Sequence, residues 1–270
     1  MRTLIHLSDL HFGRVDEALL KPLITLIRQL KPDAVVVSGD LTQRARSTQF
    51  KQARHFLDAL PSPQIIVPGN HDVPLHNIFH RFARPLDKYR RYISPNLEPF
   101  YVDDEIAVIG INSARSLTLK NGRVNQRQIA RVQERLSNLD AHLIKVIVTH
   151  HPFDLPIDYT KKEIIGRAPM AMKIFASHGA DLLLAGHLHV SHAGNTAARY
   201  ALGGYAALVV QAGTATSTRQ RGESNSFNVI QINSPRISIQ RFTWIPEQSE
   251  FTVLTTESFQ RSDHGWERDV

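Results

Sequence analysis

The stretch 4-LIHLSDLH-11 joins a short apolar run, Leu4–Leu7, to two side chains that can bind metal ions, Asp9 and His11. An apolar run of this length is typical of a β-strand that is covered on both faces. The same arrangement recurs four more times. The later runs and the blocks that follow them are Ala34–Val37 with Ser38–Gly39–Asp40, Ile65–Val67 with Gly69–Asn70–His71–Asp72, Leu143–Val148 with Thr149–His150–His151–Pro152, and Leu182–Leu184 with Gly186–His187–Leu188–His189.

These five blocks predict a single site, because ligands of layered α/β proteins gather at the carboxyl ends of strands. Two pairs, Asp9/His11 and His187/His189, are separated by two residues. In an extended chain each pair points to one side. One block alone has an ordinary structural explanation, such as a helix cap or a turn. Five blocks in succession favour a metal site.

Further apolar runs predict strands at Ile106–Ile111, Leu208–Val210, Asn228–Ile232 and Ile237–Phe242. Helical spacing predicts helices at Asp16–Leu30, Ser47–Leu60, Asn125–Leu139 and Pro169–Ser177. Strands and helices alternate early, and strands alone fill the last third. The sequence therefore predicts an α/β fold in which two sheets pack face to face with helices outside. We expect one domain over residues 1–245 and a polar tail over 246–270 that is mobile or docks onto a partner.

The composition limits the chemistry. The chain has no cysteine, which excludes disulfides and thiol catalysis, so a metal must be held by His, Asp, Glu or Asn. Such a shell suits Mn, Fe or Zn. The net charge is +7, from 32 basic and 25 acidic residues. This charge either attracts phosphate-bearing substrates or reflects an Arg-rich solvated surface. Since no apolar run reaches the ~20 residues of a membrane span, we expect a cytoplasmic protein.

The blocks D-L-H, G-D-L, G-N-H-D, H-H-P and G-H-L-H resemble those of the calcineurin-like metallophosphoesterases, over about Thr3 to His189. The resemblance implies a four-layer αββα sandwich, with two mixed β-sheets flanked by helices. It also implies a site for two divalent metal ions between the sheet edges. The implied reaction is attack on phosphorus by a hydroxide that bridges the two metals.

The resemblance carries roles onto single residues. The implied ligands of the first metal are Asp9, His11, Asp40 and His189, and those of the second are Asp40, Asn70, His150 and His187, with Asp40 bridging. His71 resembles the histidine that donates a hydrogen bond or a proton toward the leaving group. Asp72 either orients His71 or caps a helix, and His151 lies behind a ligand or faces the substrate. The other histidines match no block, and we expect them on the surface or in the core.

The spacing looks most like that of bacterial class III cyclic-nucleotide phosphodiesterases and related glycerophosphodiesterases, as does the stretch from Gly213 to Asn228. Arg219 and Arg221, within that stretch, either meet the substrate phosphate or are exposed loop residues. We therefore expect a small phosphodiester substrate, such as cyclic AMP. The alternatives are a glycerophosphodiester or another small diester, DNA as for a repair exonuclease, or a non-catalytic scaffold. The tail or an apolar helix face could join two copies in a homodimer.

Overall fold

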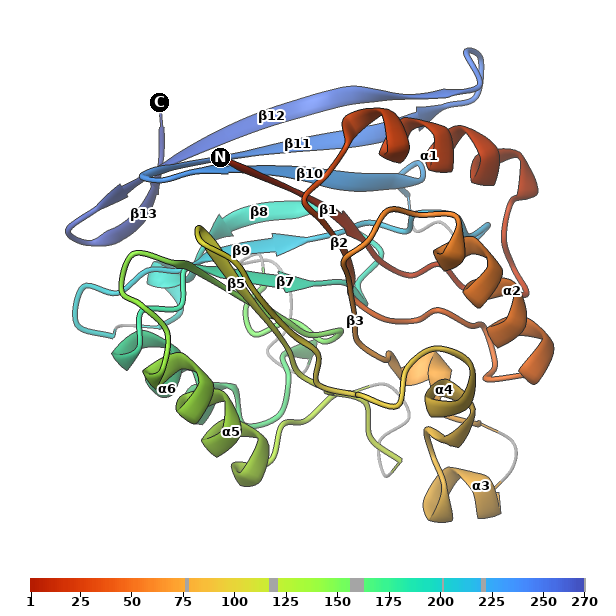
Figure 1. The fold of residues 1–270 in the computed structure, drawn as a ribbon, viewed down its shortest axis with the longest axis horizontal. Coiled ribbons are helices and arrows are strands. Elements are labelled where there is room, and N and C mark those ends of the chain that lie inside the picture. Colours follow the sequence, from red (N-terminus) through yellow and green to blue (C-terminus); the bar gives the residue numbers. More distant parts are fainter. Residues whose placement is uncertain (76–77, 117–120, 156–162, 201, 220–221, 270) are drawn as a thin grey trace.

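The structure is a computed structural model that describes residues 1–75, 78–116, 121–155, 163–200, 202–219 and 222–269. Its strands form two sheets (Figure 1). The seven-stranded sheet contains, in spatial order, β13 (Gly265–Arg268), β12 (Glu250–Ser262), β11 (Arg236–Ile245), β10 (Ser226–Asn233), β1 (Arg2–Leu7), β2 (Ala34–Val37) and β3 (Gln64–Ile66). The six-stranded sheet contains β4 (Phe100–Val102), β5 (Ile106–Gly110), β6 (Ile144–Val148), β7 (Leu182–Ala185), β9 (Leu208–Gln211) and β8 (His192–Asn195).

Both sheets mix parallel and antiparallel pairs. Strands β1, β2 and β3 are parallel to one another, whereas β10 joins β1 antiparallel. Strands β5, β6, β7 and β9 are parallel, and β4 and β8 close the two edges as antiparallel strands. The carboxyl ends of β1, β2 and β3 therefore lie at one edge of their sheet, as do those of β5, β6 and β7.

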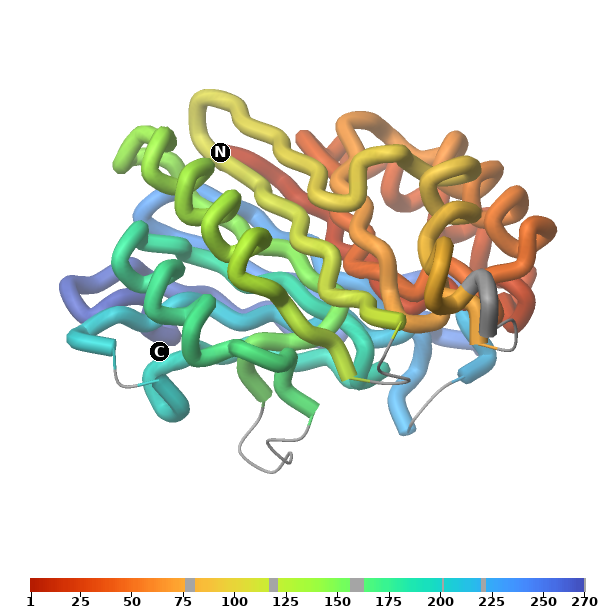
Figure 2. The backbone as a smooth tube through the Cα atoms, turned by 90° about the horizontal axis from the view of Figure 1, so that it is seen from below, coloured from red at the N-terminus to blue at the C-terminus, as the bar shows by residue number. Residues whose placement is uncertain are grey.

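Helices cover the outer faces of the sheets, and the described helices are α1 (Glu17–Leu30), α2 (Ser47–Asp58), α3 (Ile78–Ala83), α4 (Asp87–Tyr92), α5 (Gln126–Ser137) and α6 (Ala168–Ser177). Helix α1 starts where the Asp16 side chain accepts a hydrogen bond from the Ala18 N–H, and it buries Leu19, Leu23 and Ile27 along one face. Figure 2 shows α5 and α6, in green, on the face nearest the viewer.

Three hydrophobic clusters make the four layers. One packs α1 and α2 against the seven-stranded sheet, through residues such as Leu23 and Phe50. A second lies between the sheets and joins Val36 of one to Val146 of the other. The third packs α5 and α6 against the six-stranded sheet. The predicted αββα sandwich is confirmed.

The predicted strands and helices are present, with ends that differ by at most three residues. The sequence did not predict α3, α4, β4 or β8, because each is at most six residues long and carries too little periodicity. Among the described residues, the longest helix is α1, with 14 residues, and no helix is long and apolar enough to cross a bilayer.

The segment after Pro246 differs from the expected polar tail. Most of it forms β12 and β13, which extend the seven-stranded sheet. Only Phe251, Phe259 and Trp266 of this segment are buried, and the remaining side chains are polar or exposed. A bulge between Arg241 and Phe242 also shifts the register with β11. Three buried aromatics in a polar stretch give little alternation, so the sequence pattern did not indicate strands.

Trp266 fixes the end of the chain. Its side chain is 1% exposed, and its indole N–H donates to Asp181 Oδ1 at 3.0 Å.

We expect Trp266→Ala to lower the free energy of unfolding by about 3–5 kcal/mol, because a large buried side chain is lost. Urea denaturation measures this loss. Val253→Ala, at a position 46% exposed on β12, is the control and should change stability by less than about 0.5 kcal/mol. A loss below about 1 kcal/mol for Trp266→Ala would mean that the segment is not part of the core.

Candidate metal centre

The five sequence blocks converge at the carboxyl ends of the strands. Blocks follow β1, β2 and β3 in one sheet, and β6 and β7 in the other. Six of the seven predicted ligands are at most 6% exposed: Asp9, His11, Asp40, His150, His187 and His189. The two sheets therefore enclose their polar side chains in the interior between them.

The side chains face one another across short distances. Asp9 Oδ1 lies 3.4 Å from His11 Nε2 and 3.5 Å from His189 Nε2. Asp40 Oδ2 lies 3.4 Å from His150 Nε2 and 3.8 Å from His11 Nε2. Asp40 thus stands between the two sets of histidines, as a bridging carboxylate would. Asn70, the seventh predicted ligand, places its Oδ1 3.1 Å from His150 Nε2.

Three groups have ligand atoms that all lie within 4.8 Å of one another, and each could hold a metal ion. They are Asp9 with His11 and His189, Asp9 with Asp40 and His150, and His150 with His151 and His187. Asp9 Oδ1 and both ring nitrogens of His11 are buried without a hydrogen-bond partner among the described residues. Buried polar atoms of this kind are costly unless something binds them. A cation among them would satisfy both the carboxylates and the neutral imidazoles, so the residues fit divalent metal ions.

The charges within the centre depend on one another. Burial disfavours ionised Asp9 and Asp40, but His189 and His150 outweigh it and hold the pKa of both carboxyls well below the usual range. Burial lowers the pKa of His150, but the charge of Asp40 and a hydrogen bond to it raise this pKa to about 9. The carboxylates are therefore stabilised as anions where a cation would bind.

The backbone of the centre is strained. Asp9, His11, Asp40, His187 and His189 all have positive φ, between 50° and 76°. This left-handed region is unfavourable for residues with a Cβ, and such residues concentrate at functional sites. The extended-chain explanation for the D-x-H and H-x-H spacing is therefore wrong. The pairs converge because the chain turns sharply at each ligand, and not because alternate residues share a face.

Glycines before the ligands permit close approach of the loops. A Cβ at Gly69 would collide with the Asp40 carboxylate, and one at Gly186 would collide with the Ser8 hydroxyl. Both positions therefore require glycine for lack of space.

Neighbouring groups orient the histidine rings. His189 Nδ1 lies 2.6 Å from the Thr214 hydroxyl, and His150 Nδ1 lies 2.8 Å from the Ser38 carbonyl. In metal sites such contacts fix the tautomer and aim the other nitrogen. Neither Thr214 nor Ser38 was expected from the sequence to orient a histidine. Ser38 binds through its backbone, which leaves no signature in the sequence, and Thr214 lies far along the chain from His189.

His151 is fully buried behind two predicted ligands. Its ring lies 4.8 Å from that of His150 and 4.5 Å from that of His187, and its Nδ1 is 2.8 Å from the Ser113 hydroxyl. These ring contacts place His151 directly against two of the predicted ligands.

Asp72 does not orient the His71 ring. Its carboxylate accepts hydrogen bonds from the backbone N–H groups of Leu41, Thr42 and Gly69 and from the Thr42 hydroxyl. It therefore fixes the loop that carries Asp40. Burial and the charge of Asp40 raise the pKa of Asp72 to about 6.

The His71 ring forms hydrogen bonds with two described residues, and its centroid lies 5.0 Å from that of the His11 ring. Its Nδ1 lies 2.8 Å from the Gln43 carbonyl oxygen, and its Nε2 lies 3.1 Å from Arg219 Nη1. Burial is the main cause that lowers its pKa. Arg219 thus reaches the centre, as one of its two predicted roles requires. Arg221 lies outside the described residues.

Comparison with known proteins identifies the fold and the family. Residues 2–191 match the model of the Calcineurin-like phosphoesterase family, which is more than half of the chain. The chain belongs to this family. The family uses divalent metal ions, which agrees with the donor groups described above.

Several curated relatives of this phosphoesterase are named as diesterases. It is 27% identical over 202 residues to glycerophosphodiester phosphodiesterase GpdQ of Enterobacter lignolyticus, covering 67% of this chain and 72% of that one. It is 27% identical over 200 residues to a Synechococcus protein named "Probable cyclic nucleotide phosphodiesterase", covering 69% and 73%.

Solved structures share the fold of this phosphoesterase. A purple acid phosphatase of yellow lupin superposes with a TM-score of 0.73 at 11% identity, over 97% of this chain and 55% of that one. A dimetal phosphatase of Danio rerio superposes with a TM-score of 0.66 at 14% identity, over 94% and 98%. At these identities the likeness shows the fold alone.

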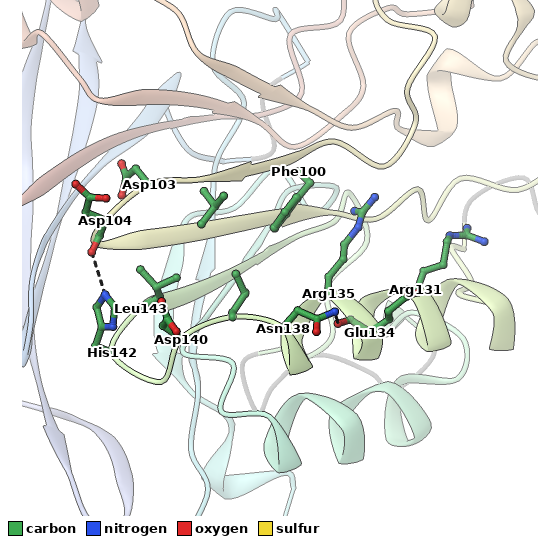
Figure 3. A pocket seen from close by; sticks show the side chains of 12 residues that line it. Phe100, Asp103, Asp104, Arg131, Glu134, Arg135, Asn138, Asp140, His142 and Leu143 are labelled. Atoms are coloured by element: carbon green, nitrogen blue, oxygen red, sulfur yellow. Dashed lines mark hydrogen bonds between the residues drawn. The ribbon is translucent and has the colours of Figure 1, made fainter.

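A separate groove of the phosphoesterase lies between the β4–β5 hairpin and α5 (Figure 3). Its lining includes Asp103 and Asp104 of the hairpin turn, and His142 and Leu143 just before β6. His142 Nε2 bonds the Asp104 carbonyl at 3.2 Å. These residues lie at the amino ends of β5 and β6, opposite the metal centre, so the groove is not part of it.

We expect Thr214→Val to weaken metal binding, because it removes the hydroxyl that holds His189 Nδ1. Loss of such a partner typically lowers metal affinity by about 10- to 100-fold. Mn²⁺ titration calorimetry of the purified protein measures the affinity. Thr218→Val is the matched control, since it removes a hydroxyl of the same loop that bonds the Arg14 carbonyl and, among the described residues, no group of the metal centre. Equal affinities for the two variants would contradict the role of Thr214.

Proposed function

We propose that this chain is a two-metal phosphodiesterase for a small phosphodiester, most specifically a cyclic nucleotide such as cyclic AMP. The observation that carries the proposal is the pair of buried carboxylates, Asp9 and Asp40, each faced by histidines from both sheets. Such a cluster can hold two cations side by side. The basic net charge of +7 also favours an anionic substrate.

The proposed ligands divide between two ions. The first ion is held by Asp9, His11, Asp40 and His189. The second is held by Asp40, Asn70, His150 and His187. The contacts of Asp40 with both His11 and His150 support its place between the ions. In this proposal His151 and Asp72 act by positioning other residues. His151 packs against the rings of His150 and His187. Asp72 holds the loop that carries Asp40.

When bound, two divalent ions lower the pKa of a water and stabilise negative charge on phosphate oxygens. The chain contributes the geometry. The Ser38 carbonyl and the Thr214 hydroxyl aim His150 and His189, so that their Nε2 atoms face the carboxylates. The backbone N–H of His71 donates to Asp40 Oδ1 at 2.8 Å and fixes the position of that carboxylate. Since these groups are already placed, binding requires little rearrangement.

The diesterase names of the curated relatives support the substrate class, and they include both cyclic-nucleotide and glycerophosphodiester enzymes. A glycerophosphodiester is therefore the second candidate. A nuclease is less favoured, because these curated relatives are named for cyclic nucleotides and glycerophosphodiesters. A non-catalytic scaffold is disfavoured because every expected ligand position carries a suitable residue.

A substrate panel tests the proposal. The purified protein, loaded with Mn, Fe or Zn, is given cyclic AMP, a glycerophosphodiester, a phosphomonoester and single-stranded DNA. We expect cyclic AMP to be cleaved with the highest kcat/KM. A preference for the glycerophosphodiester would select the second candidate. Failure to cleave any diester under all three loadings would reject the enzymatic proposal.

Asn70→Ala tests the division of ligands. We expect it to weaken one of two metal sites selectively, because it removes a ligand of the second ion only. Metal stoichiometry at limiting metal concentration, measured after dialysis, should fall from about two toward one. Asn233→Ala, at an exposed position in the β10–β11 hairpin, is the control. Unchanged stoichiometry and affinity would reject the assignment of Asn70.

A further inference from the structure

The loop between β9 and β10 contacts the metal centre at two places. Near its start, the Thr214 hydroxyl lies 2.6 Å from His189 Nδ1. Five residues later, Arg219 Nη1 lies 3.1 Å from His71 Nε2. One short segment therefore contacts His189, a proposed ligand of the first ion, and His71, whose ring lies 5.0 Å from that of His11, another proposed ligand of the same ion.

This loop is held firmly against the segment that carries Asp9 and His11. The N–H of Ala215 donates to the Ser8 carbonyl at 3.1 Å, and the N–H of Thr218 donates to the Arg14 carbonyl at 2.9 Å. The Arg219 N–H donates to the Ser217 hydroxyl at 3.1 Å. The position of Arg219 is thus set by the same segment that sets the first metal group.

The hydrogen-bond partners of the His71 ring determine which of its nitrogens donates and which accepts. A backbone carbonyl only accepts, so His71 Nδ1 donates its proton to Gln43. A guanidinium only donates, so His71 Nε2 is the acceptor for Arg219. The ring therefore presents a lone pair at Nε2. In this arrangement His71 cannot donate toward a leaving group, which differs from the role that the resemblance implies.

Arg219 is the donor at this position. It is half-buried, and no carboxylate of the described residues forms an ion pair with it. The guanidinium has several N–H donors and uses one of them on His71, so the others can bind another acceptor. A cation that lies beside a site for two dications is favourable only if an anion joins it. Phosphate oxygens suit the planar fork of a guanidinium.

We propose that Arg219 binds a phosphate oxygen of the substrate and that His71 is the residue that positions Arg219. The proposal rests on the proposed function, because it assigns the substrate's phosphate to this side of the metal centre. The His71 ring acts through Nε2, which holds the guanidinium, and the His71 backbone N–H holds Asp40. His71 links substrate binding to metal binding.

The test measures two quantities in metal-loaded protein. Calorimetry gives the affinity for inorganic phosphate, and kinetics give kcat/KM for an aryl phosphodiester. We expect Arg219→Ala to lower both by about 10- to 100-fold, as for the loss of a charged hydrogen bond, with unchanged metal content. Arg219→Lys should restore part of the loss, since it keeps the charge without the fork. Added guanidinium, at concentrations that do not unfold the protein, should partly rescue Arg219→Ala.

The control is Arg236→Ala, at an exposed position in the hairpin at the opposite end of β1. His71→Gln separates the two roles of His71, because its amide oxygen can still accept from Arg219 but cannot act as an acid. We expect His71→Gln to keep more phosphate affinity than His71→Ala, and the losses in Arg219→Ala and His71→Ala to be non-additive when combined.

Wild-type phosphate affinity in Arg219→Ala would overturn the inference while leaving the proposed function intact. Equal loss of turnover in His71→Gln and His71→Ala, without loss of phosphate affinity, would restore His71 as the acid. If the wild type cleaves no diester, the proposed function fails, and phosphate binding alone then decides the role of Arg219.

Discussion

The burial of Asp9 and Asp40 among histidines is the constraint on which the rest of the structure depends. Two carboxylates in the interior are unfavourable unless positive charge meets them. The chain also accepts left-handed backbone at five ligand positions, and each costs about 1–3 kcal/mol. Such strain persists only where the surroundings impose it. Here the loops are joined directly: the N–H groups of Asp9 and His11 donate to the carbonyls of Gly39 and Asp40.

Side chains of the centre also brace its backbone. Asp9 Oδ2 accepts from the His187 N–H, and Asp40 Oδ1 accepts from the His71 N–H. Each carboxylate therefore uses one oxygen to hold a loop from elsewhere in the chain, while the other faces the histidines. The two sheets supply the rigid frame, because their ladders and the cluster between them fix where each strand ends. A metal centre assembled this way forms only when both sheets are folded and packed against each other.

The central strands and the five polar blocks that follow them could be predicted from the sequence, because buried parallel strands are continuous apolar runs. The choice of seven proposed ligands within these blocks came from the family resemblance. The rest could not, for identifiable reasons. Strand β12 pairs with β11 across a bulge and has only Phe251 and Phe259 buried among its thirteen residues. The Gln43 carbonyl that holds His71 is a backbone group, so any residue type could supply it. The pairs Asp9/His11 and His187/His189 converge through left-handed backbone at all four residues, which their spacing of two does not reveal.

The loop between β9 and β10 shows why the family's motifs do not describe the whole site. They end at His189, yet the hydroxyl that aims His189 and the guanidinium that contacts His71 both come from residues 214–219. Because one anchored segment makes both contacts, a change in the loop would move a proposed metal ligand, His189, and the proposed phosphate contact, Arg219, together. Relatives could then keep the five blocks and still differ in substrate through this loop. Selectivity among phosphodiesters would follow from where Arg219 places its charge, and the metal ligands would remain the same.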